Sequence, residues 1–167
     1  MKNVLPALAV ALAFSTGIVR GQSTFQATLT GSQENPANAS PGTGLGTLVL
    51  SADQSTITVN ESWSGLTAPA TLSHIHGPAA PGANASVLFP FSGVPSATSG
   101  SIPQQTFAIN ATQVGYLMNG LLYFNVHSGN FPGGEIRGQI LAVPEPGAMG
   151  LLGLGLAAVG WKLRRRV

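Results

Sequence analysis

Between residues 24 and 143, short runs of alternating apolar and polar residues are separated by clusters of Gly, Pro, Asn and Ser. An alternation with a period of two is typical of strands that bury one face, and the clusters are typical of turns. The pattern predicts strands within residues 25–31, 85–91, 104–110, 121–128 and 134–143, and a hairpin over 45–66. About seven short strands indicate an all-β fold, an antiparallel β-sandwich or an open barrel.

In the hairpin, the turn is predicted at Asp53 and Gln54. One face of its two strands is apolar and is predicted to enter the core, namely Leu48, Leu50, Ile57, Val59 and Trp63.

One short helix is predicted at 110–120, among the strands. Asn110 is a favourable residue to cap its start, and Gly120 is favourable just after its end. Val114, Leu117 and Met118 are expected on one apolar face.

The first 21 residues have the layout of a secretory signal peptide, with Lys2, an apolar run from Val4 to Phe14, and then small and polar residues. We therefore expect export through the secretion machinery, with cleavage ahead of Gln22. A retained membrane anchor is the alternative, but the apolar run is short for a span.

Residues 144–167 form a second terminal segment, in which Pro144, Glu145 and Pro146 are followed by an apolar stretch at 147–161 and a basic tail. Fifteen helical residues cover roughly 22 Å, less than the ~30 Å hydrocarbon core, so this is a marginal transmembrane segment. The basic tail favours a cytoplasmic location for its own end.

This C-terminal arrangement resembles the PEP-CTERM sorting signal of Gram-negative bacteria. The resemblance implies transient membrane insertion and cleavage by an exosortase near Pro144–Pro146. It further implies release to the cell surface, the outer membrane or the extracellular matrix. A permanent anchor is the alternative.

Charge is sparse between the two terminal segments. Residues 22–143 contain Glu34, Asp53, Glu61, Glu135 and Arg137, one positive against four negative charges. Without a basic patch, nucleic-acid binding is excluded as a function. The chain has no cysteine, which excludes disulfides, thiolate catalysis and cysteine-ligated zinc.

Three blocks, at 29–51, 72–91 and 120–140, resemble the successive blocks of a CHRD domain over Phe25–Ile140. The most specific are His-Ile-His-Gly at 74–77 and the segment 123–139. The resemblance gives a division into a leader at 1–21, a CHRD-like β domain at 22–143 and the sorting segment at 144–167. It implies an exported module that binds an extracellular protein or polysaccharide, or that has a structural role in the matrix.

The histidines lie in these specific blocks. Residues two apart in a strand point to the same face, so His74 and His76 present two imidazoles together while Ile75 faces the core. His127 ends another predicted strand, which a β fold can place beside the pair. Three neutral imidazoles with an open position suit copper or zinc, and copper is favoured by intrinsic affinity. The alternatives are a turn with structural histidines and, less favoured, catalysis by these residues.

Glu135 and Arg137 are also two residues apart and are predicted to share a strand face as a buried structural pair. The sequence contains no nucleophile elbow, phosphate-binding glycine loop or carboxylate dyad, and so favours a non-enzymatic function. The two functions left open are a binding or structural module and a small copper or zinc protein for metal storage or redox chemistry.

Overall fold

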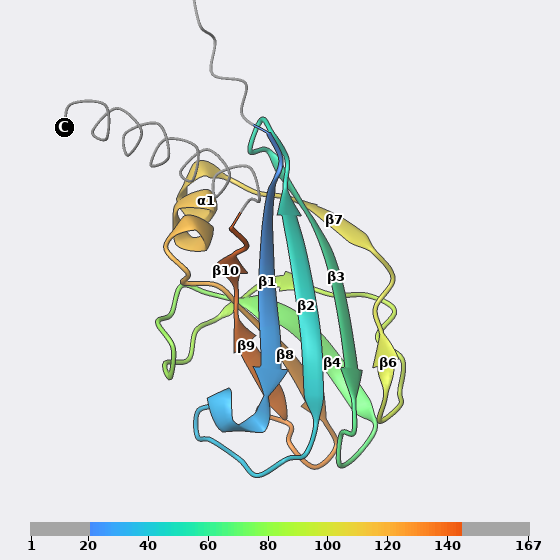
Figure 1. The fold of residues 1–167 in the computed structure, drawn as a ribbon. Helices are drawn as coiled ribbons and strands as arrows, with labels where there is room; N and C mark the ends of the chain where they lie inside the picture. Colours follow the sequence, from blue (N-terminus) through green and yellow to red (C-terminus); the bar gives the residue numbers. More distant parts are fainter. Residues whose placement is uncertain (1–20, 145–167) are drawn as a thin grey trace, which may run out of the picture.

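A ten-stranded antiparallel sheet forms the framework of residues 21–144, the part of the chain described by this computed structural model (Figure 1). The strands are β1 (Ser23–Thr30), β2 (Thr43–Leu50), β3 (Thr56–Ser64), β4 (Ala70–His76), β5 (Val87–Pro90), β6 (Gly100–Ser101), β7 (Gln105–Ala108), β8 (Tyr123–Ser128), β9 (Ile136–Gln139) and β10 (Leu141–Ala142). Their order is β5-β4-β8-β9-β1-β2-β3-β6, with β10 paired to β1 and β7 paired to β3. The helices are a 3-10 turn, η1 (Gly31–Gln33), and α1 (Ala111–Met118).

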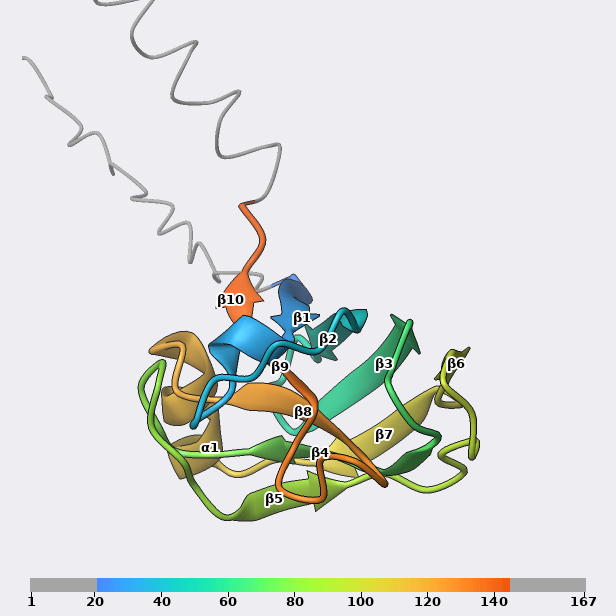
Figure 2. The ribbon, with the colours of Figure 1, turned by 90° about the horizontal axis from the view of Figure 1, so that it is seen from below.

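The sheet curls into a half-barrel, so that β1, β2 and β3 face β8, β4 and β5 across the core (Figure 2). The side-chain amide of Gln105 on β7, which pairs with β3, is hydrogen-bonded to Ser92 in the segment after β5 and so connects the two edges of the curled sheet. It accepts a hydrogen bond from the Ser92 backbone N–H at 3.0 Å and donates one to the Ser92 carbonyl oxygen at 3.0 Å. The prediction of an all-β fold with one short helix is confirmed, and the open barrel is the form adopted.

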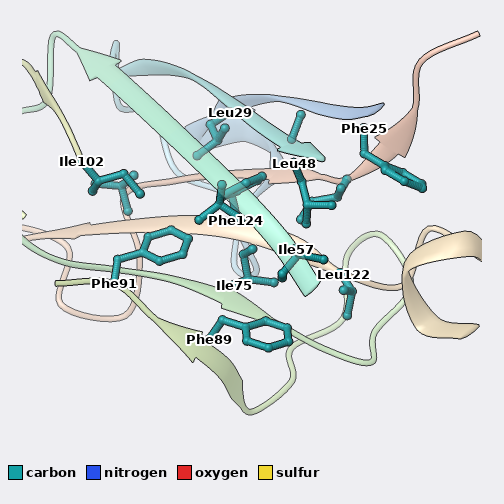
Figure 3. Close-up of a cluster of buried hydrophobic side chains, with 14 of the residues drawn as sticks. Phe25, Leu29, Leu48, Ile57, Ile75, Phe89, Phe91, Ile102, Leu122 and Phe124 are labelled. Atoms are coloured by element: carbon teal, nitrogen blue, oxygen red, sulfur yellow. The ribbon is translucent and has the colours of Figure 1, made fainter. Parts of the chain in front are cut away.

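The predicted hairpin forms as β2 and β3. Its five predicted core residues are at most 4% exposed, and Figure 3 shows two of them, Leu48 and Ile57, beside Phe124 from the opposite layer. Phe124 packs on Gly46, where a Cβ would lie 2.5 Å from the ring. The absence of a side chain at Gly46 therefore lets the two layers approach.

Helix α1 starts and ends near the predicted positions. The Asn110 side chain accepts from the Gln113 backbone N–H and the Gln113 side chain accepts from the Asn110 N–H, at 3.0 Å each, forming a capping box. Val114 and Leu117 are buried, but Met118 is 49% exposed, so the prediction that it shares their apolar face was wrong. Met118 lies about 100° around the helix from Leu117, outside the narrow face that contacts the sheet.

The predicted strand at 134–143 is divided between β9 and β10, with the buried Ile140 between them. The two-residue strand β6 was not predicted.

No helix within residues 21–144 is long and apolar enough to cross a membrane. The predicted apolar span at 147–161, residues Glu145 and Pro146, and the leader apart from Gly21 lie outside the described residues.

A carboxyl group lies inside the half-barrel. Glu61 on β3 is 2% exposed, and its Oε2 is hydrogen-bonded to the Ser73 hydroxyl of β4. That hydroxyl also lies 3.0 Å from the Asn125 carbonyl oxygen of β8. Because a hydroxyl has one hydrogen to donate, a protonated Glu61 that donates to Ser73 satisfies both contacts. Burial raises the pKa of Glu61 to about 8, against a lowering effect of the Ser73 bond.

This burial predicts a pH-dependent stability. Between about pH 7 and 8 the folded protein holds a proton on Glu61 that the unfolded chain has released, so rising pH lowers the free energy of unfolding. We expect a loss of roughly 1 kcal/mol per pH unit in the metal-free protein, measured by urea denaturation. Glu61→Gln keeps the shape of the protonated group and should make this dependence markedly shallower. Equal slopes for both proteins would contradict a protonated Glu61.

Candidate metal centre

The three histidines lie on two neighbouring strands of the half-barrel. His74 and His76 belong to β4, and His127 belongs to β8, where it is paired in register with Leu72 of β4. Residues paired in an antiparallel sheet point to the same face. Ile75 points the other way and is fully buried in the core, as predicted (Figure 3). The imidazoles therefore lie on the outer face of the sheet. The burial of Ile75 on the inner face fixes the position of the strand that carries His74 and His76.

The structure brings the three side chains together. One ligand atom from each of His74, His76 and His127 can be chosen so that all lie within 4.8 Å of one another. The His74 Nδ1 and the His127 Nε2 are 3.3 Å apart. With metal–nitrogen bonds of about 2.0–2.1 Å, two ligands at a tetrahedral angle are roughly 3.3 Å apart. This pair therefore has the spacing of two nitrogens that share one metal ion.

Backbone carbonyls fix the hydrogen positions on two of the rings. The His76 Nδ1 is 3.0 Å from the Ala85 carbonyl oxygen, and the His127 Nδ1 is 2.9 Å from the Pro132 carbonyl oxygen. A carbonyl only accepts, so each Nδ1 carries the hydrogen and each Nε2 keeps its lone pair. The His76 Nε2 is buried and has no hydrogen-bond partner among the described residues. This is the arrangement that second-sphere carbonyls give to metal-binding histidines.

The surroundings keep the imidazoles uncharged. Burial lowers the pKa of all three, and the neighbouring histidines lower that of His74 further, to about 4. The bonds to Ala85 and Pro132 act in the opposite direction for His76 and His127. At neutral pH all three rings are neutral, the state required for metal binding.

Tyr123 of β8 supports His76 from the side. The two rings are stacked, with centroids 4.9 Å apart and an interplanar angle of 4°. The Tyr123 hydroxyl accepts from the Ala85 N–H at 3.1 Å, and the Ala85 carbonyl is the partner of His76. Arg137 lies 3.6 Å from the Tyr123 ring centroid and donates to Asn84 Oδ1 at 3.1 Å. These contacts hold residues 84 and 85 and the His76 ring in one arrangement.

Tyr123→Phe tests this support. The variant keeps the ring stack and removes the hydroxyl that positions Ala85, so we expect a roughly 10-fold loss of Cu(II) affinity. Isothermal titration measures the affinity, and the near-ultraviolet circular dichroism reports the fold. Tyr116→Phe, on α1, is the matched control and should bind as the unmodified protein does. An unchanged affinity in Tyr123→Phe would show that the hydroxyl does not position the ligand.

Glu135 and Arg137 are both buried, at 0% and 1% exposure, but they do not form the predicted pair within the described residues. Glu135 Oε1 accepts from the Ser40 hydroxyl and from the Thr67 N–H, both at 2.6 Å, whereas Arg137 contacts Asn84 and Tyr123. Strand β9 begins only at Ile136, so the alternation that would place both side chains on one face does not extend to Glu135. Glu135 instead links the loops that carry Ser40 and Thr67 to the segment just before β9.

Two parts of the centre had no signal in the sequence. The first is the pair of carbonyl partners of His76 and His127, which come from loops, and any residue type can supply a carbonyl.

The second is Glu34, which belongs to the loop after η1 and is 7% exposed. Burial raises the pKa of Glu34 to about 7, while the nearby charge of Arg137 acts against the rise. The Arg137 charge is therefore opposed by Glu34, a residue 103 positions earlier.

Comparison with known families accounts for most of the chain. A family model described as CHRD domain matches residues 25–140, and the chain therefore belongs to the CHRD family. The PEP-CTERM protein-sorting motif matches residues 142–166. Comparison with curated proteins and with solved structures finds no match.

These matches confirm both predicted resemblances. The sorting motif implies export, processing by an exosortase and sorting to the cell surface of a Gram-negative bacterium. All three histidines lie inside the CHRD match.

Proposed function

We propose that this exported CHRD protein binds copper at His74, His76 and His127. The proposal is carried by the buried, unpartnered Nε2 of His76, in a cluster where one ligand atom from each of the three imidazoles lies within 4.8 Å of the others. An exosortase cut near Pro144–Pro146 would release the domain, with its copper site, to the outer membrane surface or the matrix.

Structural histidines fit these contacts less well. A buried nitrogen without a partner costs about 1–3 kcal/mol, and a purely structural ring is expected to have both nitrogens satisfied. Here Nδ1 of His76 is bonded and Nε2 is not. A metal ion would take up that lone pair together with that of the His127 Nε2, in place of the hydrogen bond that the His127 Nε2 accepts from the His74 Nδ1 at 3.3 Å.

Copper fits better than zinc because imidazole ligands bind Cu(II) more tightly in the divalent series. We expect the tag-free full chain to bind one Cu(II) at least about tenfold more tightly than Zn(II), measured by competition with a chelator of known affinity. Weak binding that is equal in the unmodified protein and in the three single alanine variants would reject the metal site.

Binding of an extracellular protein or polysaccharide, and a structural role in the matrix, stay predictions from the sequence. A copper site is compatible with either of them, because it occupies one face of two strands.

A further inference from the structure

Two buried oxygen atoms that the metal centre does not use lie where the loop after η1 meets the loop between β8 and β9, at one end of the half-barrel (Figure 1). They are Oε1 of Glu34 and Oδ1 of Asn125, on side chains that are 7% and 4% exposed. Neither atom has a hydrogen-bond partner among the described residues. A Cβ at Gly134 would lie 2.7 Å from each of them, so the two acceptors converge on one small space.

This space adjoins a cavity of about 250 Å³ between the two loops. Glu34 and Gly134 line the cavity, and its other walls include apolar residues, namely Pro36, Ala37, Phe131 and Pro132. The side-chain amide of Asn38 donates to the Glu135 carbonyl oxygen at 3.1 Å and so holds the loops together. Pockets for drug-sized ligands usually measure roughly 300–1,000 Å³, so this cavity suits a smaller group.

We propose that this cavity binds a primary ammonium group at the end of an alkyl chain, as a lysine side chain presents it. An ammonium group has three hydrogens to donate and accepts none, so it matches two oxygens that lack donors. The carboxylate of Glu34 would accept a charge-assisted hydrogen bond, which is stronger than one between neutral groups. The alkyl chain would pack on Pro36 and Phe131. This inference is independent of copper binding.

The negative charge of Glu34 is only partly compensated. Arg137 is the charged group that acts on Glu34, but its guanidinium donates to Asn84 and to the Ala83 carbonyl oxygen. Burial raises the pKa of Glu34 to about 7 in spite of Arg137. A bound ammonium group would supply the missing positive charge. The excess of negative charges in residues 22–143 also favours a cationic partner.

Other ligands fit these atoms less well. Calcium takes roughly six to eight oxygen ligands, whereas two side-chain oxygens converge beside Gly134 and the neighbouring walls are largely apolar. An alcohol has a single hydroxyl hydrogen to offer to two acceptors. An alkyl ammonium ion matches both the oxygens and the apolar walls.

The test uses the tag-free, metal-free full chain labelled with nitrogen-15, and n-butylammonium chloride as the probe. Titration followed by amide chemical shifts should give saturable shifts at Gly133 and Gly134. n-Butanol has the same alkyl chain with a hydroxyl group, and it should bind at least about 10-fold more weakly. Glu34→Gln keeps the shape of the side chain but removes its charge, so it should lower the n-butylammonium affinity at least about 10-fold.

Asp53→Asn is the matched control, because it removes one negative charge from the exposed turn between β2 and β3 and should leave the affinity unchanged. Equal affinity in Glu34→Gln and Asp53→Asn would overturn the proposal. So would the absence of saturable shifts, or calcium that produces the same shifts at lower concentrations.

The comparison of the two probes needs no variant, so it decides the matter even if Glu34→Gln does not fold. If n-butanol binds as tightly as n-butylammonium, the cavity recognises the alkyl chain alone and the proposal is wrong. None of these results bears on the copper site, because the protein is free of metal throughout.

Discussion

Replacement of His76 by alanine is expected to lower the Cu(II) affinity at least about 100-fold, more than the 10–100-fold typical of losing a second-sphere partner. His76 supplies a lone pair that the protein has already oriented, because its Nδ1 hydrogen is bonded to the Ala85 carbonyl and its ring is stacked on Tyr123. Without it, His74 and His127 leave only two protein nitrogens for the metal. Calorimetric titration of the tag-free protein measures the change.

The control for this variant is Leu72→Ala. Leu72 is 53% exposed and is paired with His127, so it lies on the same face without offering a ligand atom. Its replacement should leave both affinity and fold unchanged. If His76→Ala is folded by circular dichroism and binds Cu(II) as Leu72→Ala does, the three histidines do not form one centre.

Gly138→Ala is expected to destabilise the domain by at least about 3 kcal/mol, the upper range for overpacking a closed core. A Cβ at Gly138 on β9 would lie 2.8 Å from the Thr28 carbonyl carbon and would overlap the Thr28 carbonyl oxygen on β1. Both obstacles are backbone, which cannot move aside as a flexible side chain can. Thermal unfolding of the variant should show a strongly lowered midpoint or no cooperative transition.

Gly115→Ala is the matched control. Gly115 lies within α1, and a Cβ there would meet no atom within 4 Å. The substitution should raise stability by about 0.5–1 kcal/mol, because alanine loses less backbone entropy in a helix. Equal effects at the two glycines would mean that β9 and β1 do not approach as closely as described.

The sequence predicted those features that depend on local patterns. The period of two in the β2–β3 hairpin identified its buried face, and Asn110 with Gly120 marked the ends of α1 closely. The spacing of His74 and His76 placed both on one face of a strand.

Features that depend on long-range contacts could not be predicted in this way. The separate partners of Glu135 and Arg137 are set by where β9 begins and by loops that carry Ser40 and Asn84. The burial of Glu61 inside the half-barrel was also unforeseen, since its partner Ser73 belongs to a strand on the facing layer.

The three blocks that identify the CHRD family meet at the candidate centre. The block at 72–91 supplies two histidines and the Ala85 carbonyl, and the block at 120–140 supplies His127, Pro132 and Arg137. The block at 29–51 supplies Glu34, whose carboxyl group interacts with the charge of Arg137. The most specific parts of the sequence therefore lie around one polar face of the half-barrel.

The central claim is that one copper ion binds between the three imidazoles, and anomalous diffraction from crystals of the copper-loaded protein tests it most directly. Data collected above and below the copper absorption edge should give one strong peak about 2.0 Å from the His76 Nε2, the His127 Nε2 and a ring nitrogen of His74. A map without a peak at these residues, or with copper bound elsewhere on the domain, would contradict the account.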